Sequence, residues 1–452
     1  MRLTVVGGGG FRVPLVHRAL IEDAAKGDGV VDEMVLVDSD PGRLDAVMAV
    51  LGHQRASHPG VPLAVRATTD LDAGLRATGL VFAAIRVGGL AGRVVDERVA
   101  LREGVLGQET VGAGGICYGL RTVPVALRLA ERIAAVAPDA WVVNFTNPAG
   151  VVTEVMSHVL GDRVIGICDS PEGLGRRAAR ALGADPGRCR FDYAGLNHLG
   201  WLRGLYLDGS DRLPDLLADT AALNSFDEGE LFGAEWLQTL GAIPNEYLHY
   251  YYFAREARTA AGGASSTRGE LVAQQQAEFY EVAARHPADA YARWETALRA
   301  REETYMAENR AAVAARPRVV ADVDGGGYTA VALTVLRAIA RDEPARLIVD
   351  VRNRDAIPGL APESVVEVPC IVDANGARPL AVGALDPHQA ALVGAVKAVE
   401  TQTILAALTG SRRAALRAFA WHPLVDSVAV ARRLLDGYLA AAPGLADILH
   451  TG

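Results

Sequence analysis

A chain of 452 residues is too long for one compact core, so we expect two domains or one domain with large additions. Half of the residues are hydrophobic and 22% are charged, which is typical of a soluble globular enzyme. The formal net charge is −9 and there is no long basic run, which argues against nucleic acid or an anionic membrane as the main partner.

The N-terminus and the cysteines favour a cytoplasmic protein without a membrane segment. Glycines interrupt the first apolar run too early for a signal peptide, and no apolar run approaches the roughly 18 residues that span a bilayer. The four cysteines lack the spacing of a disulfide framework, so we expect reduced thiols. They are Cys117, Cys168, Cys189 and Cys370.

The chain begins with the order strand, glycine turn, helix, strand. The expected strands are residues 3–6 and 33–37, and the helical pattern between them covers residues 15–20. This is the order of a dinucleotide-binding unit, in which glycines let the backbone approach a pyrophosphate and the acid after the second strand holds a ribose hydroxyl. The residues assigned to this role are Gly7, Gly8, Gly9, Phe11, Arg12 and Asp38.

The glycine motif is imperfect, because Arg12 stands where a third glycine is expected. The alternative is a glycine-rich turn of another kind of α/β protein. Further strands are expected at residues 79–85, 140–145 and 164–167, with helices at 123–136 and 151–160. Alternating strands and helices predict a Rossmann-like, doubly wound parallel sheet, which we assign to an NAD-binding domain over residues 1–170.

Residues 171–452 differ in pattern and predict a mixed α+β, largely helical second domain for substrate, metal and oligomerisation. No flexible linker separates the halves, so we expect them to pack tightly around a shared cleft. Strands are expected at residues 202–207, 346–351 and 365–369. Helices are expected at residues 271–285, 289–309 and 330–341, and from 388 to 439.

A thiol and a carboxylate, Cys168 and Asp169, follow the strand at residues 164–167, and His198 comes later in the chain. Our hypothesis is that Cys168 and His198 bind one metal ion with Asp169 beside it, and ligand softness alone favours zinc. The alternative is that the thiol and the imidazole are separate, inert core residues.

Other polar stretches also interrupt the pattern. A loop from Arg86 to Arg93 would suit a phosphate or carboxylate, or is merely solvated. Asn144 and Asn147 could bind sugar hydroxyls, or cap the next helix. The tyrosines from Tyr247 to Tyr252 could form a packing face, or supply a base whose pKa a cation lowers.

Taken in order, these stretches resemble glycoside hydrolase family 4, the NAD- and metal-dependent glycosidases that act largely on 6-phosphorylated sugars. The resemblance runs over nearly the whole chain. It implies a lactate/malate dehydrogenase-like arrangement of the two domains. The motifs that carry it are residues 7–14, Gly107-Gln108-Glu109-Thr110, residues 144–148, Cys168-Asp169-Ser170-Pro171, Gly195-Leu196-Asn197-His198, residues 244–252 and Val368-Pro369-Cys370.

The resemblance implies a route different from that of two-carboxylate glycosidases. NAD⁺ oxidises C3 of the sugar, a base removes the acidified C2 proton, the leaving group is eliminated, water adds, and the ketone is reduced again. The implied metal ligands are Cys168 and His198, with Mn²⁺ the usual ion. The implied catalytic residues are Asp169 as proton donor, Tyr247 as base and Glu109 as the residue that raises its basicity. Arg93, Asn147 and Arg268 are implied to bind substrate.

The resemblance leaves the anomer and the base open. Asp169 matches a phospho-α-glucosidase pattern, whereas Asn197, His198 and the rest of the chain are closer to the phospho-β-glucosidase branch, which we favour. Tyr250 and Tyr251 are alternatives to Tyr247 as the base. Other interpretations are an NAD-dependent hydroxy-acid dehydrogenase and a non-catalytic NAD-binding regulator. The expected partners are a phosphorylated disaccharide or glycoside and further copies of the chain, in a homodimer or homotetramer.

Overall fold

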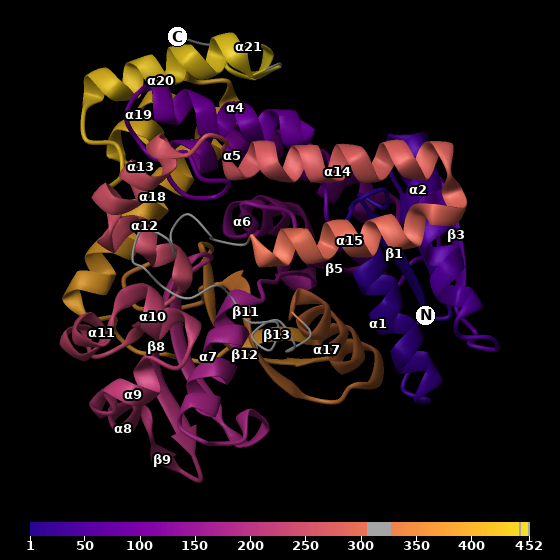
Figure 1. The fold of residues 1–452 in the computed structure, drawn as a ribbon, viewed down its shortest axis with the longest axis horizontal. Coiled ribbons are helices and arrows are strands. Elements are labelled where there is room, and N and C mark those ends of the chain that lie inside the picture. The colour runs from indigo at the N-terminus through magenta and orange to yellow at the C-terminus, as the bar shows by residue number, and fades with distance from the viewer. Residues whose placement is uncertain (305–326, 443, 451–452) are drawn as a thin grey trace.

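The computed structural model describes residues 1–304, 327–442 and 444–450, and it contains one sheet of 13 strands with helices on both faces (Figure 1). Six strands form the parallel half, in the order β6-β5-β4-β1-β2-β3. They are β1 (Arg2–Val6), β2 (Glu33–Val37), β3 (Ala64–Thr68), β4 (Leu80–Ala83), β5 (Trp141–Asn144) and β6 (Val164–Gly166).

The other half of the sheet is antiparallel and continues from β6 through β11, β12, β7 and β8 to β10. Its strands are β7 (Arg190–Leu196), β8 (Leu199–Leu207), β9 (Ser210–Asp211), β10 (Ile243–Pro244), β11 (Ala345–Arg352), β12 (Val365–Asp373) and β13 (Gly376–Pro379). Because one sheet runs through both halves, residues far apart in sequence are held in one frame.

The helices of the first half alternate with the parallel strands. They are α1 (Val13–Ala25), α2 (Pro41–Ala56), α3 (Leu71–Leu75), α4 (Gly89–Arg102), α5 (Gly112–Val136), α6 (Ala149–Leu160) and α7 (Ser170–Ala181), with short 3₁₀ turns η1 (Gly161–Arg163) and η2 (Pro186–Arg188).

The helices of the second half fall into three groups. Short helices follow β8: α8 (Leu213–Ala218), α9 (Thr220–Leu223), α10 (Asp227–Phe232), α11 (Ala234–Leu240), η3 (Glu246–Leu248), α12 (His249–Tyr252) and α13 (Ala254–Gly263). Longer helices come next: α14 (Arg268–Arg285), η4 (Pro287–Asp289), α15 (Ala290–Glu303) and α17 (Gly327–Arg341). The chain ends with α18 (Pro387–Thr409), α19 (Arg412–Trp421), α20 (Val428–Ala441) and α21 (Leu445–Ile448).

Alternation along the strands sends side chains to two cores. On β4, Leu80 and Phe82 pack on the side of α1, α2 and α17, whereas Val81 and Ala83 pack on the side of α5 and α6. A third core joins α4 and α5 to α18, α19 and α20. The helices α14 and α15 lie side by side and cover α2, although α2 comes far earlier in the sequence (Figure 1).

The predicted fold class is confirmed, with differences in detail. Five strands, β3, β7, β9, β10 and β13, were not predicted, because each is only two residues long or lacks an uninterrupted apolar run. The helical stretch expected from 388 to 439 is three helices, since Gly410 ends α18 in the left-handed conformation (φ +70°). Of the helix expected over 289–309, residues 305–309 lie outside the described residues. Among the described helices, α18 alone is long and apolar enough to cross a membrane.

Two buried acids mark the junction between the parallel and antiparallel halves. Asp350 on β11 lies opposite Gly166 on β6 and opposite Glu367 on β12, and Glu367 lies opposite Gly195 on β7. Both carboxyl groups are fully buried. A Cβ at Gly166 would lie 2.7 Å from the Asp350 Cβ, so glycine at this position makes room for the acid. Burial and the nearby Glu400 carboxylate raise the pKa of Asp350 to about 8. The Lys397 ammonium acts in the opposite direction but does not outweigh them.

We predict that Asp350 makes folding stability fall as pH rises from about 5 to 8. The folded chain keeps a proton on Asp350 that the unfolded chain loses near pH 4, so stability should decrease by up to about 1.4 kcal/mol per pH unit and level off above pH 8. Asp350→Asn should remove this pH dependence of the free energy of unfolding, as measured in urea. Glu363→Gln, on the exposed loop after the same strand, should leave it unchanged. An unchanged pH dependence in Asp350→Asn would contradict the assignment.

Candidate active site

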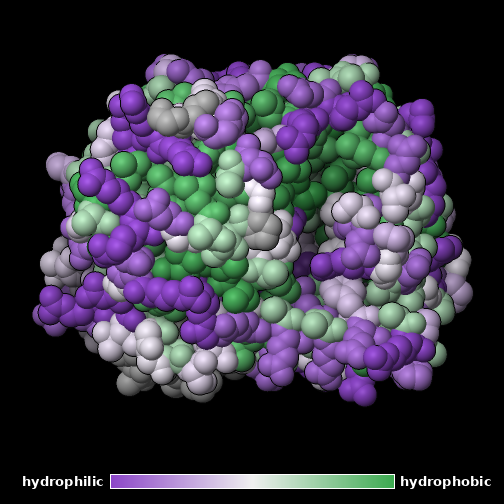
Figure 2. Space-filling view, turned by 90° about the horizontal axis from the view of Figure 1, so that it is seen from above, coloured by the Kyte–Doolittle hydropathy of each residue, from purple (hydrophilic) through white to green (hydrophobic). Residues whose placement is uncertain are grey.

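A cavity of about 1340 Å³ lies at the carboxyl ends of the parallel strands, where open α/β sheets bind ligands. On the face shown in Figure 2 the surface is hollowed, with green hydrophobic residues in the hollow and purple hydrophilic residues around it. The cavity receives side chains from both halves of the sheet. Of the predicted site residues, those that line it are Gly7, Phe11, Arg12, Asp38, Arg93, Glu109, Asn147, Cys168, Asp169, His198, Tyr247 and Arg268.

The glycine turn after β1 fits the predicted dinucleotide site. Gly7 has φ +92°, and a Cβ there would lie 2.4 Å from the carbonyl oxygen of Ala84. A Cβ at Gly8 would lie 2.6 Å from the Cβ of Leu36. The backbone N–H of Gly9 donates to Asp38 Oδ2 at 2.9 Å, which fixes the acid beside the turn. The turn therefore lies directly on the strand ends, with the N-terminus of α1 behind it, as a pyrophosphate requires.

The rest of this loop is anchored by the second half of the chain. The Phe11 side chain is buried against Phe279 and Trp294, and its carbonyl oxygen accepts a hydrogen bond of 2.8 Å from Trp294 Nε1. The carbonyl oxygen of Arg12 accepts from the Tyr328 hydroxyl at 2.8 Å, and the Arg12 guanidinium lies 5.4 Å from the centre of the Tyr328 ring. The buried Phe11 side chain thus anchors the loop to α14 and α15, while Arg12 occupies the position of the missing third glycine.

The predicted metal ligands open onto the same cavity. Cys168 follows β6, and His198 is the second residue of the two-residue turn between β7 and β8, where it has φ +62°. Thr110 Oγ1 lies 2.7 Å from His198 Nδ1, and Nε2 has no hydrogen-bond partner among the described residues. No group of three or more His, Cys, Asp and Glu side chains within the described ranges is arranged to hold a metal. Cys168 and His198 both line the cavity, and catalytic metal sites likewise leave positions open for water or substrate.

The electrostatics of these two side chains fit a cation. Burial lowers the pKa of His198 to about 4, so the imidazole is neutral at pH 7, the form that binds metals. Burial, with the charges of Glu367 and Asp169, raises the pKa of the Cys168 thiol, so an adjacent cation is needed to hold the thiolate.

The structure separates the candidate tyrosines. Tyr247 lines the cavity and stacks on the His198 ring, with centroids 3.7 Å apart and planes at 9°. Tyr250 also lines the cavity, whereas Tyr251 stacks on His422 at 6.0 Å and lies outside the lining. Burial raises the pKa of Tyr251. Tyr247 and Tyr250 are therefore the tyrosines with access to a ligand, and Tyr247 is the one against the predicted metal ligand.

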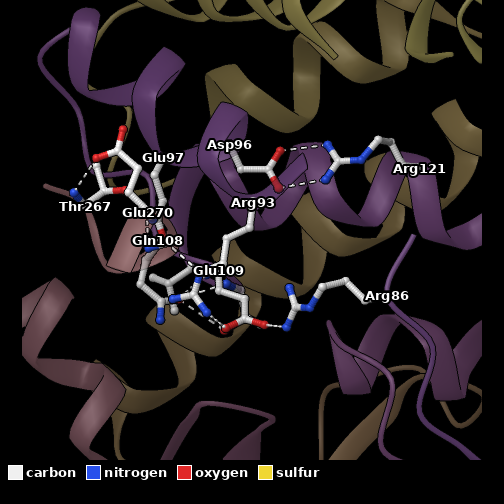
Figure 3. A network of polar contacts seen from close by, with 12 residues as sticks. Arg86, Arg93, Asp96, Glu97, Gln108, Glu109, Arg121, Thr267 and Glu270 are labelled. Atoms are coloured by element: carbon white, nitrogen blue, oxygen red, sulfur yellow. Dashed lines mark hydrogen bonds and ion pairs between the residues drawn. The ribbon is translucent and has the colours of Figure 1, made fainter. Parts of the chain in front are cut away.

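Glu109 is the centre of a partly buried charge network (Figure 3). Its carboxylate pairs with Arg86 and, at 2.6 Å, with Arg93. Arg93 also donates to Glu97 at 2.9 Å, and Glu97 accepts from the backbone N–H of Gly269 at 2.7 Å. The two guanidinium groups outweigh burial and lower the pKa of Glu109, which stays ionised. The network joins the loop before α5 to α4 and to the start of α14, where Arg268 lies.

A group of arginines gathers at this side of the cavity, and sequence reasoning missed one of them. Arg301, at the end of α15, is close enough to Arg12, Arg93 and Arg268 that burial first, and then their charges, lower its pKa to about 9. Arg268 donates to the Arg301 carbonyl oxygen at 2.8 Å. An anion placed here would offset this repulsion, and guanidinium groups bind phosphate or carboxylate bidentately.

The two asparagines after β5 have different roles. Asn144 is fully buried and holds the loop, donating to the Thr146 carbonyl oxygen at 3.2 Å and to Thr153 Oγ1 at 3.1 Å. Asn147 lines the cavity and makes no side-chain hydrogen bond among the described residues. The Asp169 carboxylate, at the start of α7, is likewise on the cavity and without a hydrogen bond or ion pair in the described part of the chain. Both are placed to contact a ligand.

Other residues of the site carried no sequence signal. Tyr328 stacks on Phe145 with centroids 4.2 Å apart, and both line the cavity beside Arg12. Tyr280 of α14 donates to the Gly9 carbonyl oxygen at 2.6 Å and packs under Arg43. These contacts join residues hundreds of positions apart, which local patterns do not reveal.

Models of one known protein family match both the N-terminal and the C-terminal half of the chain. The model described as family 4 glycosyl hydrolase matches residues 2–184, and the model described as its C-terminal domain matches residues 193–425. A probable 6-phospho-beta-glucosidase of Bacillus subtilis (strain 168) is 32% identical over 453 residues, which cover 98% of this chain and 96% of that protein.

Solved structures with the same overall fold include both kinds of phosphoglucosidase. The 6-phospho-beta glucosidase from Thermotoga maritima, solved with manganese, NAD⁺ and glucose-6-phosphate, has a TM-score of 0.81 and 26% identity, and the likeness covers 100% of both chains. A 6-phospho-alpha-glucosidase from gut microorganisms, solved with NAD and Mn²⁺, has a TM-score of 0.80 and 25% identity, covering 98% of both chains.

Proposed function

The chain belongs to family 4 of the glycosyl hydrolases, and from this premise we propose that it hydrolyses 6-phosphoglucosides, with β-linked substrates favoured. The observation that carries the proposal is the single cavity in which the glycine turn, Cys168, His198 and Tyr247 meet a group of arginines. The relatives named as 6-phosphoglucosidases support the substrate class, and the neighbours with bound NAD and manganese support NAD and Mn²⁺ as cofactors. A phosphorylated substrate and free thiols favour the cytoplasm.

The 6-phosphate is proposed to lie among the arginines. Arg268 and Arg301 are joined by the hydrogen bond between α14 and α15, and Arg93 lies beside Glu109. A phosphate would balance the charge that lowers the pKa of Arg301. Asn147, on the loop after β5, is placed to bind a sugar hydroxyl.

Two bound cofactors would complete this site. NAD at the glycine turn supplies a hydride acceptor and donor, and a divalent cation held by Cys168 and His198 supplies Lewis acidity at the sugar oxygens. Asp38, held by the Gly9 N–H, and the N-terminus of α1 would orient the dinucleotide. Asp169 adds negative charge near Cys168, which favours a cation there.

The proposed proton transfers use residues of the cavity wall. Tyr247 removes the proton from C2 of the sugar, because its ring lies against His198 and so beside the oxygens that the cation would polarise. Asp169 donates a proton to the leaving-group oxygen. Glu109 is proposed to support Tyr247 through the position it gives the loop before α5.

A specific observation keeps the α-linked class as a second candidate. Asp169, a carboxylic acid on the cavity, matches the pattern of the phospho-α-glucosidases, and a solved phospho-alpha-glucosidase is about as similar as the beta enzyme. Because elimination follows loss of the C2 proton, the residues named here do not by themselves select one anomer.

Self-association is also proposed, as a homodimer or homotetramer. Four large apolar side chains at α18, at the end of α19 and at the start of α20 are 41% to 54% exposed. Burial of such a surface against another copy would stabilise an oligomer. The four exposed side chains are Leu405, Leu408, Trp421 and Val428.

The first test is a panel of p-nitrophenyl 6-phosphoglucosides and galactosides of both anomers, with and without NAD⁺ and Mn²⁺. We expect p-nitrophenol release that needs both cofactors and leaves NAD⁺ unconsumed, fastest with a β-glucoside. Net formation of NADH from a hydroxy acid would favour a dehydrogenase instead. Tight NAD binding without hydrolysis of any substrate in the panel would favour a regulator.

The second test concerns the base. In D₂O the released glucose 6-phosphate should carry deuterium at C2, detectable by mass spectrometry, because the C2 proton leaves during turnover. Tyr247→Phe should lower the rate about 100-fold or more. Tyr251→Phe, outside the cavity lining, should change it little and serves as the matched control. If Tyr250→Phe stops exchange while Tyr247→Phe does not, the base is Tyr250.

A further inference from the structure

The loop before α5 reaches the back of the His198 ring. Thr110 Oγ1 lies 2.7 Å from His198 Nδ1, although the two residues come from different halves of the sheet. Tyr247 covers the face of the same ring at 3.7 Å. The imidazole is therefore held at one edge and on one face, and Nε2 is the ring nitrogen left for a ligand.

The neighbouring glutamine offers the Thr110 hydroxyl an acceptor. Gln108 Oε1 lies 2.8 Å from the backbone N of Thr110 and 3.2 Å from the backbone N of Val111. Two N–H donors require an oxygen at this position, so the amide orientation of Gln108 is fixed. The Thr110 hydroxyl lies 3.3 Å from the same oxygen and can donate its proton to it.

The proposed direction of the remaining hydrogen bond rests on this donation, because a hydroxyl that donates to Gln108 offers only its lone pairs to His198 and accepts the proton of Nδ1. A neutral imidazole with its proton on Nδ1 carries its lone pair on Nε2. Metal-bound histidines are commonly oriented in this way by an acceptor on the other ring nitrogen.

The loop is rigid enough to set this geometry. A Cβ at Gly114 would lie 2.4 Å from the Gln108 carbonyl oxygen, and one at Gly115 would lie 2.4 Å from the Thr110 carbonyl oxygen. The first turn of α5 thus packs directly on the backbone of the loop. This close approach accounts for the run of glycines after Thr110, and the Glu109 ion pairs hold the loop from the other side.

We infer that Thr110, oriented by Gln108, is a positioning residue that fixes the tautomer of His198 and so prepares Nε2 to bind the divalent cation. This inference rests on the proposed function, since it assumes that His198 binds a metal.

The test measures Mn²⁺ affinity of the whole enzyme by electron paramagnetic resonance of free Mn²⁺, apart from any activity. Thr110→Val, which keeps the shape but removes the hydroxyl, should weaken Mn²⁺ binding about 10- to 100-fold. Thr110→Ser, which keeps the hydroxyl, should restore binding to within about threefold of the wild type. Thr110→Ala gives a second variant without the hydroxyl and without added bulk, and should show the same loss. NAD affinity, which depends on the distant glycine turn, should be unchanged in all three.

The outcomes separate the two claims. If the wild type binds Mn²⁺ and the affinities of both Thr110→Val and Thr110→Ala for Mn²⁺ are within threefold of that of the wild type, the inference is overturned while the proposed function stands. If Thr110→Ser loses as much affinity as Thr110→Val, the hydroxyl is not the cause and the inference is also overturned. If the wild type itself does not bind Mn²⁺, the proposed function fails and the inference with it.

Discussion

The pairing of the Glu109 carboxylate with two arginines is the interaction on which the arrangement of the cavity depends. Glu109 lies between Arg86, after β4, and Arg93, on α4, and the side chains are 15%, 29% and 6% exposed, respectively. Loss of Glu109 would take one charge partner from the buried Arg93 guanidinium, which is unfavourable in a largely desolvated site. The pairing therefore fixes one conformation of the loop before α5. The adjacent Thr110 is thereby placed at His198.

The same network extends to the side where the phosphate is proposed to lie. Arg93 binds Glu97, and Glu97 accepts from the backbone of Gly269 at the start of α14. Arg268, one residue earlier, then reaches the end of α15. One chain of charges thus connects the loop behind the predicted metal ligand to the arginines. The continuous sheet supplies the frame, since Cys168 follows a parallel strand and His198 follows an antiparallel one.

Much of the architecture was predictable because it rests on local patterns. Apolar runs predicted β1, β2, β4, β5 and β6, and the glycines after β1 predicted the turn that the structure contains at the strand ends. The edge strand β3 was missed because most of its residues are partly exposed and include Arg66. The candidate site residues from Asp38 to His198 were predicted from their positions at strand ends and from the family resemblance, and the structure places them on one cavity.

The remaining features depend on contacts between distant residues. Nothing in the local sequence indicates that Arg301 approaches Arg93, or that Tyr247 faces the cavity while Tyr251 faces His422. Asp350 and Glu367 each lie between two valines in their strands, so their burial as opposite neighbours is a property of the register. Phe11 was assigned to the cofactor from its place in the loop, and its burial against α14 and α15 became visible only in the fold.

The central claim is that one cation binds between the two halves of the sheet, at Cys168 and His198. Crystals of the full chain grown with Mn²⁺ and NAD, measured at the manganese absorption edge, test it directly. The account predicts one anomalous peak in the cavity, bonded to both Cys168 Sγ and His198 Nε2. A peak bonded elsewhere, or to His198 through Nδ1, would contradict it.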